Sequence, residues 1–156
     1  MVIIIDPQIA GISGDMILCS LVDLGADKNE IINGIKKIEK FLPESKITKL
    51  DFQKIQKHGI ESTELILEIE ENISERKGVE IKNAIINSVS ELQLSDKAKS
   101  FAESCINSLI SSESKIHGIS EDSVHFHEAS SIDTLIDIVG VTLVCDKLKL
   151  FDEKIV

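Results

Sequence analysis

A segment near residue 125 carries side chains that can bind a transition metal. His125 and His127 are separated by one residue, so in an extended chain both imidazoles project to the same side, about 6–7 Å apart. Two imidazoles placed in this way can share a metal ion, and Glu128 can join them or orient one of them. The alternative is a pair of hydrogen-bonded histidines inside the protein. The pattern leaves both a metal site and a structural role open.

Two carboxylates follow on the next predicted helix. Asp133 and Asp137 are four residues apart and therefore share one helix face. Asp133 also follows Ser130 by three residues, which is the spacing of a helix capping box and gives it a structural alternative. Asp137 has apolar neighbours on both sides, where a carboxylate is costly unless it is paired or bound to a metal. Asp137 is therefore the stronger candidate for chemistry.

A glycine-containing loop joins the first predicted strand to the first predicted helix. It aims free N–H groups and the helix dipole at an anion, and Gly11 and Gly14 permit a positive φ and a close backbone approach. Ser13 adds a hydroxyl group. Asp6 stands at the carboxyl end of the strand, a usual place for a magnesium ligand. The alternative is a plain connection in which Ser13 or Asp15 caps the helix, and no Walker A motif is present.

A third candidate lies at a predicted hairpin turn. Lys57 and the neighbouring His58 can offer a cation and an imidazole to an anionic ligand. A solvated turn is the simpler interpretation. The acidic run at 68–71 is predicted to be a solvated face.

Periodicity predicts the elements that must position these groups. Alternating or β-branched runs predict strands at 2–5, 47–55, 63–70 and 151–156, the middle two forming an antiparallel hairpin with Leu50 and Phe52 on its apolar face. Helical spacing and capping residues predict helices at 16–24, 27–41, 76–91, 95–113 and 132–148. The expected fold is α+β or mixed α/β, with a small sheet that includes the hairpin and about five flanking helices.

Composition limits the class of function. The 156 residues match a single domain, and the formal charge of −10 disfavours nucleic acid and anionic membranes as partners. The sequence has no Trp or Tyr for base stacking and no apolar run long enough to span a bilayer. Three scattered cysteines indicate a reducing, cytoplasmic setting. Arg76 is the only arginine, so a bound phosphate must be held by backbone N–H groups, lysine or a metal.

Three of these stretches together resemble the LarC family, the nickel insertion proteins of nickel-pincer nucleotide cofactor biosynthesis. The matching stretches are Asp6-Pro7 with Gly11-Ile12-Ser13-Gly14-Asp15-Met16 and Leu21 to Gly25, then Lys57-His58-Gly59-Ile60, then Lys115 to Gly118 with Val124 to Glu128 and Asp133 to Gly140. They span nearly the whole chain in the family's order. The chain departs from the family at Gln8-Ile9-Ala10, where members carry an aromatic residue and a serine, and at residues 129–132.

The resemblance implies a function. The family inserts nickel into pyridinium-3,5-bisthiocarboxylic acid mononucleotide in a CTP-dependent step that forms Ni–S and Ni–C bonds. Family chains are more than twice as long, so residues 1–156 are expected to be a single N-terminal domain. The C-terminal part would bind CTP and would support homo-oligomerisation. Mg²⁺ or Mn²⁺ is expected as a further ion, for which Asp6, Asp15, Asp133 and Asp137 are the candidate holders.

The resemblance also implies roles for residues. Nickel would be held by His125, His127, Glu128 and Asp133. Asp6, Asp15 and Asp137 would act in catalysis, and Gly11, Ser13, Gly14 and Lys57 would bind the nucleotide. Two other functions stay open: a metal carrier without chemistry of its own, and a magnesium-dependent phosphohydrolase that uses Asp6 and Asp15.

Overall fold

The structure, a computed structural model, describes residues 2–8 and 11–155, with the side chains of Glu128 and Ile155 left outside the description. Five α-helices lie in this part of the chain: α1 (Gly14–Asp23), α2 (Lys28–Ile38), α3 (Gly78–Glu91), α4 (Asp96–His117) and α5 (Ile132–Lys147). The strands are β1 (Val2–Ile3), β2 (Ser45–Lys57), β3 (Ile60–Glu71), β4 (Arg76–Lys77), β5 (His125–Phe126) and β6 (Lys154–Ile155). The predicted α+β fold with a hairpin and about five helices is confirmed.

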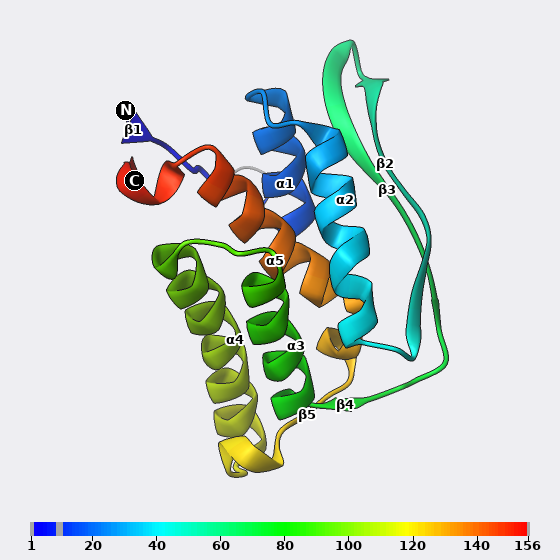
Figure 1. Cartoon of the computed structure of the whole chain (residues 1–156), viewed down its shortest axis with the longest axis vertical. Coiled ribbons are helices and arrows are strands. Elements are labelled where there is room, and N and C mark those ends of the chain that lie inside the picture. Colours follow the sequence, from blue (N-terminus) through cyan, green and yellow to red (C-terminus); the bar gives the residue numbers. More distant parts are fainter. Residues whose placement is uncertain (1, 9–10, 156) are drawn as a thin grey trace.

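Helix α5 is the centre of the core. Its apolar residues surround the axis, as in a helix that is buried on all sides, and Ile136, Val139 and Leu143 are buried. It contacts the other four helices. Figure 1 shows α5 crossing between the α1–α2 pair and the α3–α4 pair. No helix in the described ranges is both long and apolar enough to cross a membrane.

The hairpin β2–β3 covers one side of α1 and α2 (Figure 1). Leu50 and Phe52 are buried, which confirms the predicted apolar face. Both turn residues, His58 and Gly59, have a positive φ, as a two-residue hairpin turn of type I′ requires. Because this turn is so short, the ladder extends to Lys57 opposite Ile60, and both strands are longer than predicted.

Several boundaries differ from the prediction for reasons outside the local sequence. Strand β1 ends at Ile3 rather than residue 5, because its partner β6 pairs only with Val2 and Ile3. The predicted start of a helix at Arg76 is wrong, since Arg76 and Lys77 pair with β5 and the helix begins at Gly78.

Two C-terminal boundaries also differ. Helix α4 continues past residue 113 to His117, where Gly118 adopts the left-handed conformation that ends helices. The predicted final strand is reduced to β6 by a 3₁₀ turn at Leu150–Asp152, and Val156 lies outside the described residues.

Buried Arg76 ties the hairpin to the start of α5. Its guanidinium donates to the Ser130 carbonyl and to Ser45 Oγ at 2.7 Å, and lies 3.4 Å from Glu71 Oε1. Glu71 in turn accepts a hydrogen bond from the backbone N–H of Ile132 at 2.9 Å. The only arginine therefore acts inside the protein, as an anchor between β3 and α5.

Candidate functional site

The N-termini of α1 and α5 meet beneath the hairpin and enclose an open pocket of about 680 Å³, here called the carboxylate pocket. Each helix start contributes a serine and at least one aspartate, and β3 contributes an apolar wall. The lining residues are Ser13, Asp15, Ser131, Asp133, Asp137, Leu65, Leu67 and Ile69. The structure thus brings together three predicted carboxylates from the two ends of the sequence.

Gly14 allows the two helices to approach this closely. A Cβ atom at Gly14 would lie 2.4 Å from Cβ and Cγ of Asp137, which is too short for any real contact. The close approach expected at Gly14 was to a bound anion, whereas the group approached in the structure is the side chain of Asp137, and Gly14 is not among the described glycines with a positive φ. Gly11, the other glycine of the loop, has a φ of 74°, in agreement with the predicted positive value.

Asp137 is the most perturbed carboxylate of the pocket. Among the described residues, its Oδ1 is the buried side-chain atom that has no hydrogen-bond partner. Burial, together with the nearby charges of Asp133 and Asp15, raises the pKa of Asp137 to about 7, against a lowering contact from the Gly14 backbone. Such a group takes up either a proton or a cation near neutral pH.

Asp133 lies in the same pocket but is itself exposed. Desolvation by the surrounding protein raises its pKa, and the charges of Asp15 and Glu71 act in the same direction. Since Asp133 and Asp15 both raise the pKa of Asp137, a cation beside Asp137 would relieve this repulsion.

The helix caps differ in part from those predicted. Ser13 stands at the N-cap of α1, but its side chain makes no capping hydrogen bond. Asp15 lies in the first turn of α1, where its Oδ1 accepts from the Met16 backbone at 2.8 Å and from the Ser13 hydroxyl. Helix α5 is capped by Ser131, whose Oγ accepts from the Asp133 backbone at 3.2 Å. The predicted box from Ser130 is wrong, since that hydroxyl donates to the His127 carbonyl at 2.6 Å.

The histidines lie apart from the carboxylate pocket. His125 is exposed on β5, paired with Lys77 of β4, and His127 is exposed with Nδ1 3.8 Å from Glu75 Oε2. Neither lines the pocket. Among the side chains that the structure describes, no three His, Cys, Asp or Glu residues stand in an arrangement that could hold a metal ion, and the Glu128 side chain is not among them.

The remaining predicted residues are divided between two other places. Asp6 and Gly11 line an apolar groove beside α1, and Asp6 Oδ1 accepts from the Gln8 backbone at 3.0 Å. Ile9 and Ala10, where the loop departs from the family pattern, lie outside the described residues. Lys57 lies at the end of the hairpin, where its Nζ is 3.6 Å from Glu64.

Sequence reasoning missed Glu71. The acidic run at 68–71 was expected to face solvent, but the Glu71 side chain is only 18% exposed. Burial raises its pKa, yet hydrogen bonds from Ser45, Ser131 and Ile132 and the Arg76 guanidinium outweigh burial, so the pKa lies below its ordinary value. No sequence signal marked this role, because it depends on the register of β2 and β3, which places Glu71 opposite Ser45, and on the Arg76 guanidinium.

The thiols do not add metal ligands. The three cysteines are free, and burial raises the pKa of Cys19 and of Cys145 to about 11. All three therefore remain protonated at neutral pH, and a protonated thiol is a poor ligand and nucleophile.

Comparison with known proteins gives a consistent result. The sequence model of a family described as "Nickel insertion protein" matches residues 3–156. A pyridinium-3,5-bisthiocarboxylic acid mononucleotide nickel insertion protein of Staphylococcus epidermidis is 36% identical over 139 residues, which are 89% of this chain and 33% of that protein. A protein of the same name from Staphylococcus saprophyticus is 35% identical over 93% of this chain and 35% of that protein. Another, from Akkermansia muciniphila, is 34% identical over 90% of this chain and 35% of that protein.

The chain therefore spans about a third of the length of these relatives. No solved structure matches it.

Proposed function

Because this chain belongs to the nickel insertion protein family, we propose that it receives Ni²⁺ for insertion into pyridinium-3,5-bisthiocarboxylic acid mononucleotide. The observation that carries this proposal is the partnerless buried Oδ1 of Asp137, in a pocket also lined by Asp15 and Asp133. Nickel is here a substrate, and the carboxylate pocket is where it would be delivered.

Electrostatics supports a divalent cation in this pocket. The charges of Asp133 and Asp15 both raise the pKa of Asp137, and the buried cation of the region, Arg76, is engaged by Glu71 and the Ser130 carbonyl. Oxygen donors accept nickel, though less selectively than imidazole does. A weak, open oxygen site suits an ion that must be passed on to a substrate.

We assign the imidazole donors to the capture of nickel. His125 and His127 are exposed, so an incoming ion can reach them, and Glu128 adjoins them in the chain. In this proposal the ion moves from His125, His127 and Glu128 to Asp133, which lies one short 3₁₀ turn and one cap residue further on.

The nucleotide is proposed to bind at the start of α1. Ser13 would face an anionic group there, whereas the Gly11 N–H already donates to the Pro7 carbonyl at 2.9 Å and would act by shaping the loop, and Gly14 acts by its close packing on Asp137. Lys57 would add a cation from the hairpin end. Asp6 keeps the loop in shape through its bond to Gln8, and Asp15 and Asp137 stand beside the reacting ion.

Further functions belong to the part of the family protein that this chain does not span. We propose that the CTP site and the contacts of a homo-oligomer lie there, whereas Mg²⁺ or Mn²⁺ as a further ion would be held by aspartates of this chain. A cytoplasmic location is proposed because three free cysteines suit a reducing compartment.

Calorimetric titration of the chain with Ni²⁺ tests the proposal. We expect stoichiometric binding that the double variant Asp133→Asn/Asp137→Asn loses and that the double variant His125→Ala/His127→Ala weakens. The control is Asp51→Asn, an exposed carboxylate on the hairpin that pairs with Lys28. Binding that survives in the aspartate variant contradicts the proposal, and turnover of a phosphoester with Mg²⁺ alone favours the phosphohydrolase.

A further inference from the structure

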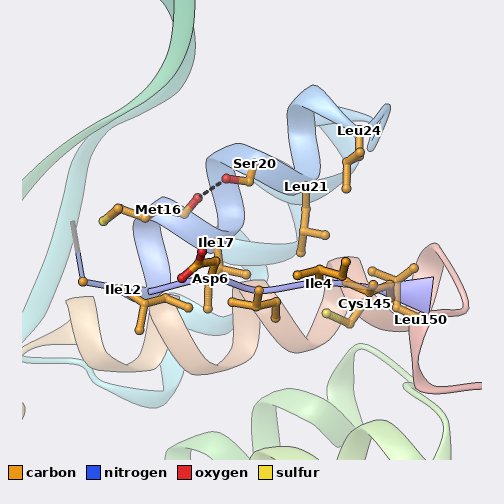
Figure 2. Close-up of a pocket in the computed structure, with 13 residues that line it drawn as sticks. Ile4, Asp6, Ile12, Met16, Ile17, Ser20, Leu21, Leu24, Cys145 and Leu150 are labelled. Atoms are coloured by element: carbon orange, nitrogen blue, oxygen red, sulfur yellow. Dashed lines mark hydrogen bonds between the residues drawn. The ribbon is translucent and has the colours of Figure 1, made fainter. Parts of the chain in front are cut away.

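An apolar groove of about 270 Å³ lies between the N-terminal segment, α1 and the end of α5, on the side of α1 away from the hairpin. Figure 2 shows the N-terminal segment crossing this region, with Met16 and Ser20 on α1, and Cys145 and Leu150 near β1. Asp6 is the one ionisable carboxylate in the lining. The groove is thus an apolar surface with little to recognise a polar ligand.

Large apolar side chains around this groove are exposed to an unusual degree. Ile4 is 76% exposed and Leu24 is 71% exposed, and Ile5, Ile12 and Met16 are exposed as well. All five line the groove. A contiguous apolar patch on a soluble protein marks a surface that another polypeptide covers.

The sheet at this groove is also incomplete. As far as the chain is described, β1 and β6 form a parallel pair of two residues each. Parallel sheets occur almost only where both faces are covered, and two short strands are too few to be stable by themselves. Ile3 packs on the core, whereas Ile4 points to the uncovered side.

We infer that this groove is the docking surface for the two thirds of the nickel insertion proteins that this chain does not span. The relatives are about three times as long as the matched region, so each of them carries polypeptide available to cover it. Docking would extend the β1–β6 sheet and bury Ile4, Ile12 and Met16.

Docking would also act on the carboxylate pocket. Gly11 and Ile12 line the groove, and the next residue, Ser13, lines the pocket. The same short loop therefore lines both the apolar groove and the carboxylate pocket. Polypeptide seated in the groove would hold this loop and, through Asp15, one side of the pocket.

A binding experiment tests this surface without nickel or nucleotide, so its outcome is independent of the proposed function. The unmatched two thirds of the Staphylococcus epidermidis relative is produced as a separate chain and titrated with residues 1–156. The variant is Ile4→Glu. The matched control is Ile116→Glu, at an isoleucine of α4 that is 74% exposed and does not line the groove. Circular dichroism shows whether both variants stay folded.

We expect one-to-one binding that Ile4→Glu weakens at least tenfold and Ile116→Glu changes by less than twofold. Absence of binding by the unaltered chain overturns the inference, as does equal weakening by the two variants. Sedimentation provides a second criterion: a dimer of residues 1–156 that Ile4→Glu dissociates would assign the groove to a second copy instead.

Discussion

The backbone of Gly14, in the first turn of α1, lies directly against the side chain of Asp137 on α5, where a Cβ atom would come within 2.4 Å. This contact joins the N-terminal loop to the core helix. It also places the half-buried Asp137 carboxylate beside Asp15 and Asp133, and burial together with these two charges raises the pKa of Asp137 to about 7. The packing and the electrostatics of the carboxylate pocket thus depend on glycine, which has no side chain, at position 14.

Replacing Gly14 by Ala tests this dependence. We expect Gly14→Ala to lower the free energy of unfolding by about 1–3 kcal/mol, because overpacking forces α1 away from α5, and to weaken nickel binding. Urea unfolding and nickel calorimetry measure the two effects. Ser20→Ala, an exposed position on the same helix, is the control and should change neither. A Gly14→Ala protein of full stability would show that the two helices adjust freely.

The pH dependence of stability should reveal Asp137. Its pKa is raised from 3.8 to about 7 in the folded protein, so the folded state binds a proton that the unfolded state has already lost. Stability therefore falls as the pH rises from about 4 to about 7 and then levels off. We expect Asp137→Asn to be more stable than the unaltered chain by about 1–3 kcal/mol at pH 8 and close to it at pH 4. Urea unfolding at the two pH values measures this difference, and a constant difference would contradict the raised pKa.

Nickel binding should strengthen with pH over the same range. Binding requires the deprotonated carboxylate, so a pKa of about 7 for Asp137 predicts roughly tenfold weaker apparent affinity at pH 6 than at pH 8. Calorimetry with the His125→Ala/His127→Ala variant separates this effect from titration of the imidazoles. If the pH dependence vanishes in that variant, the histidines rather than Asp137 control binding.

Arg76 should be important for stability through Glu71. Arg76→Met leaves the hydrogen-bonded Glu71 carboxylate partly buried without its guanidinium partner, and breaking such a pair costs about 3–5 kcal/mol. Thermal or urea unfolding measures the loss. The double variant Arg76→Met/Glu71→Gln should recover part of it, because no uncompensated charge remains. Additive losses in the double variant would show that the two residues act independently.

Much of the fold was predictable because its signals are local. At the start of α2, Asp27 accepts from the Asn29 backbone, and at the start of α4, Ser95 accepts from the Ala98 backbone, as Asp and Ser commonly do at helix N-caps. Alternation along β2 correctly identified Leu50 and Phe52 as buried. Each of these signals lies within a few residues of the structure it specifies, so neighbouring side chains and backbone preferences suffice.

The candidate site was predictable only as a set of residues. Chemistry and spacing identified Asp15, Asp133 and Asp137. That the three carboxylates meet in one pocket, whereas His125 lies outside it, depends on how α1 packs on α5 and how β5 pairs with β4.

The role of Glu71 was decided in the same way. In the sequence it is the last residue of an acidic run with the character of a solvated surface. In the structure Glu71 is partly buried, where it accepts hydrogen bonds from the buried Arg76 guanidinium and from the backbone N–H of Ile132. Residue types and local periodicity therefore determined which helices and strands form and which groups can do chemistry. Contacts between distant segments decided which of these groups share a pocket. Those contacts depend on how the finished helices and strands pack together, which no local stretch of sequence specifies.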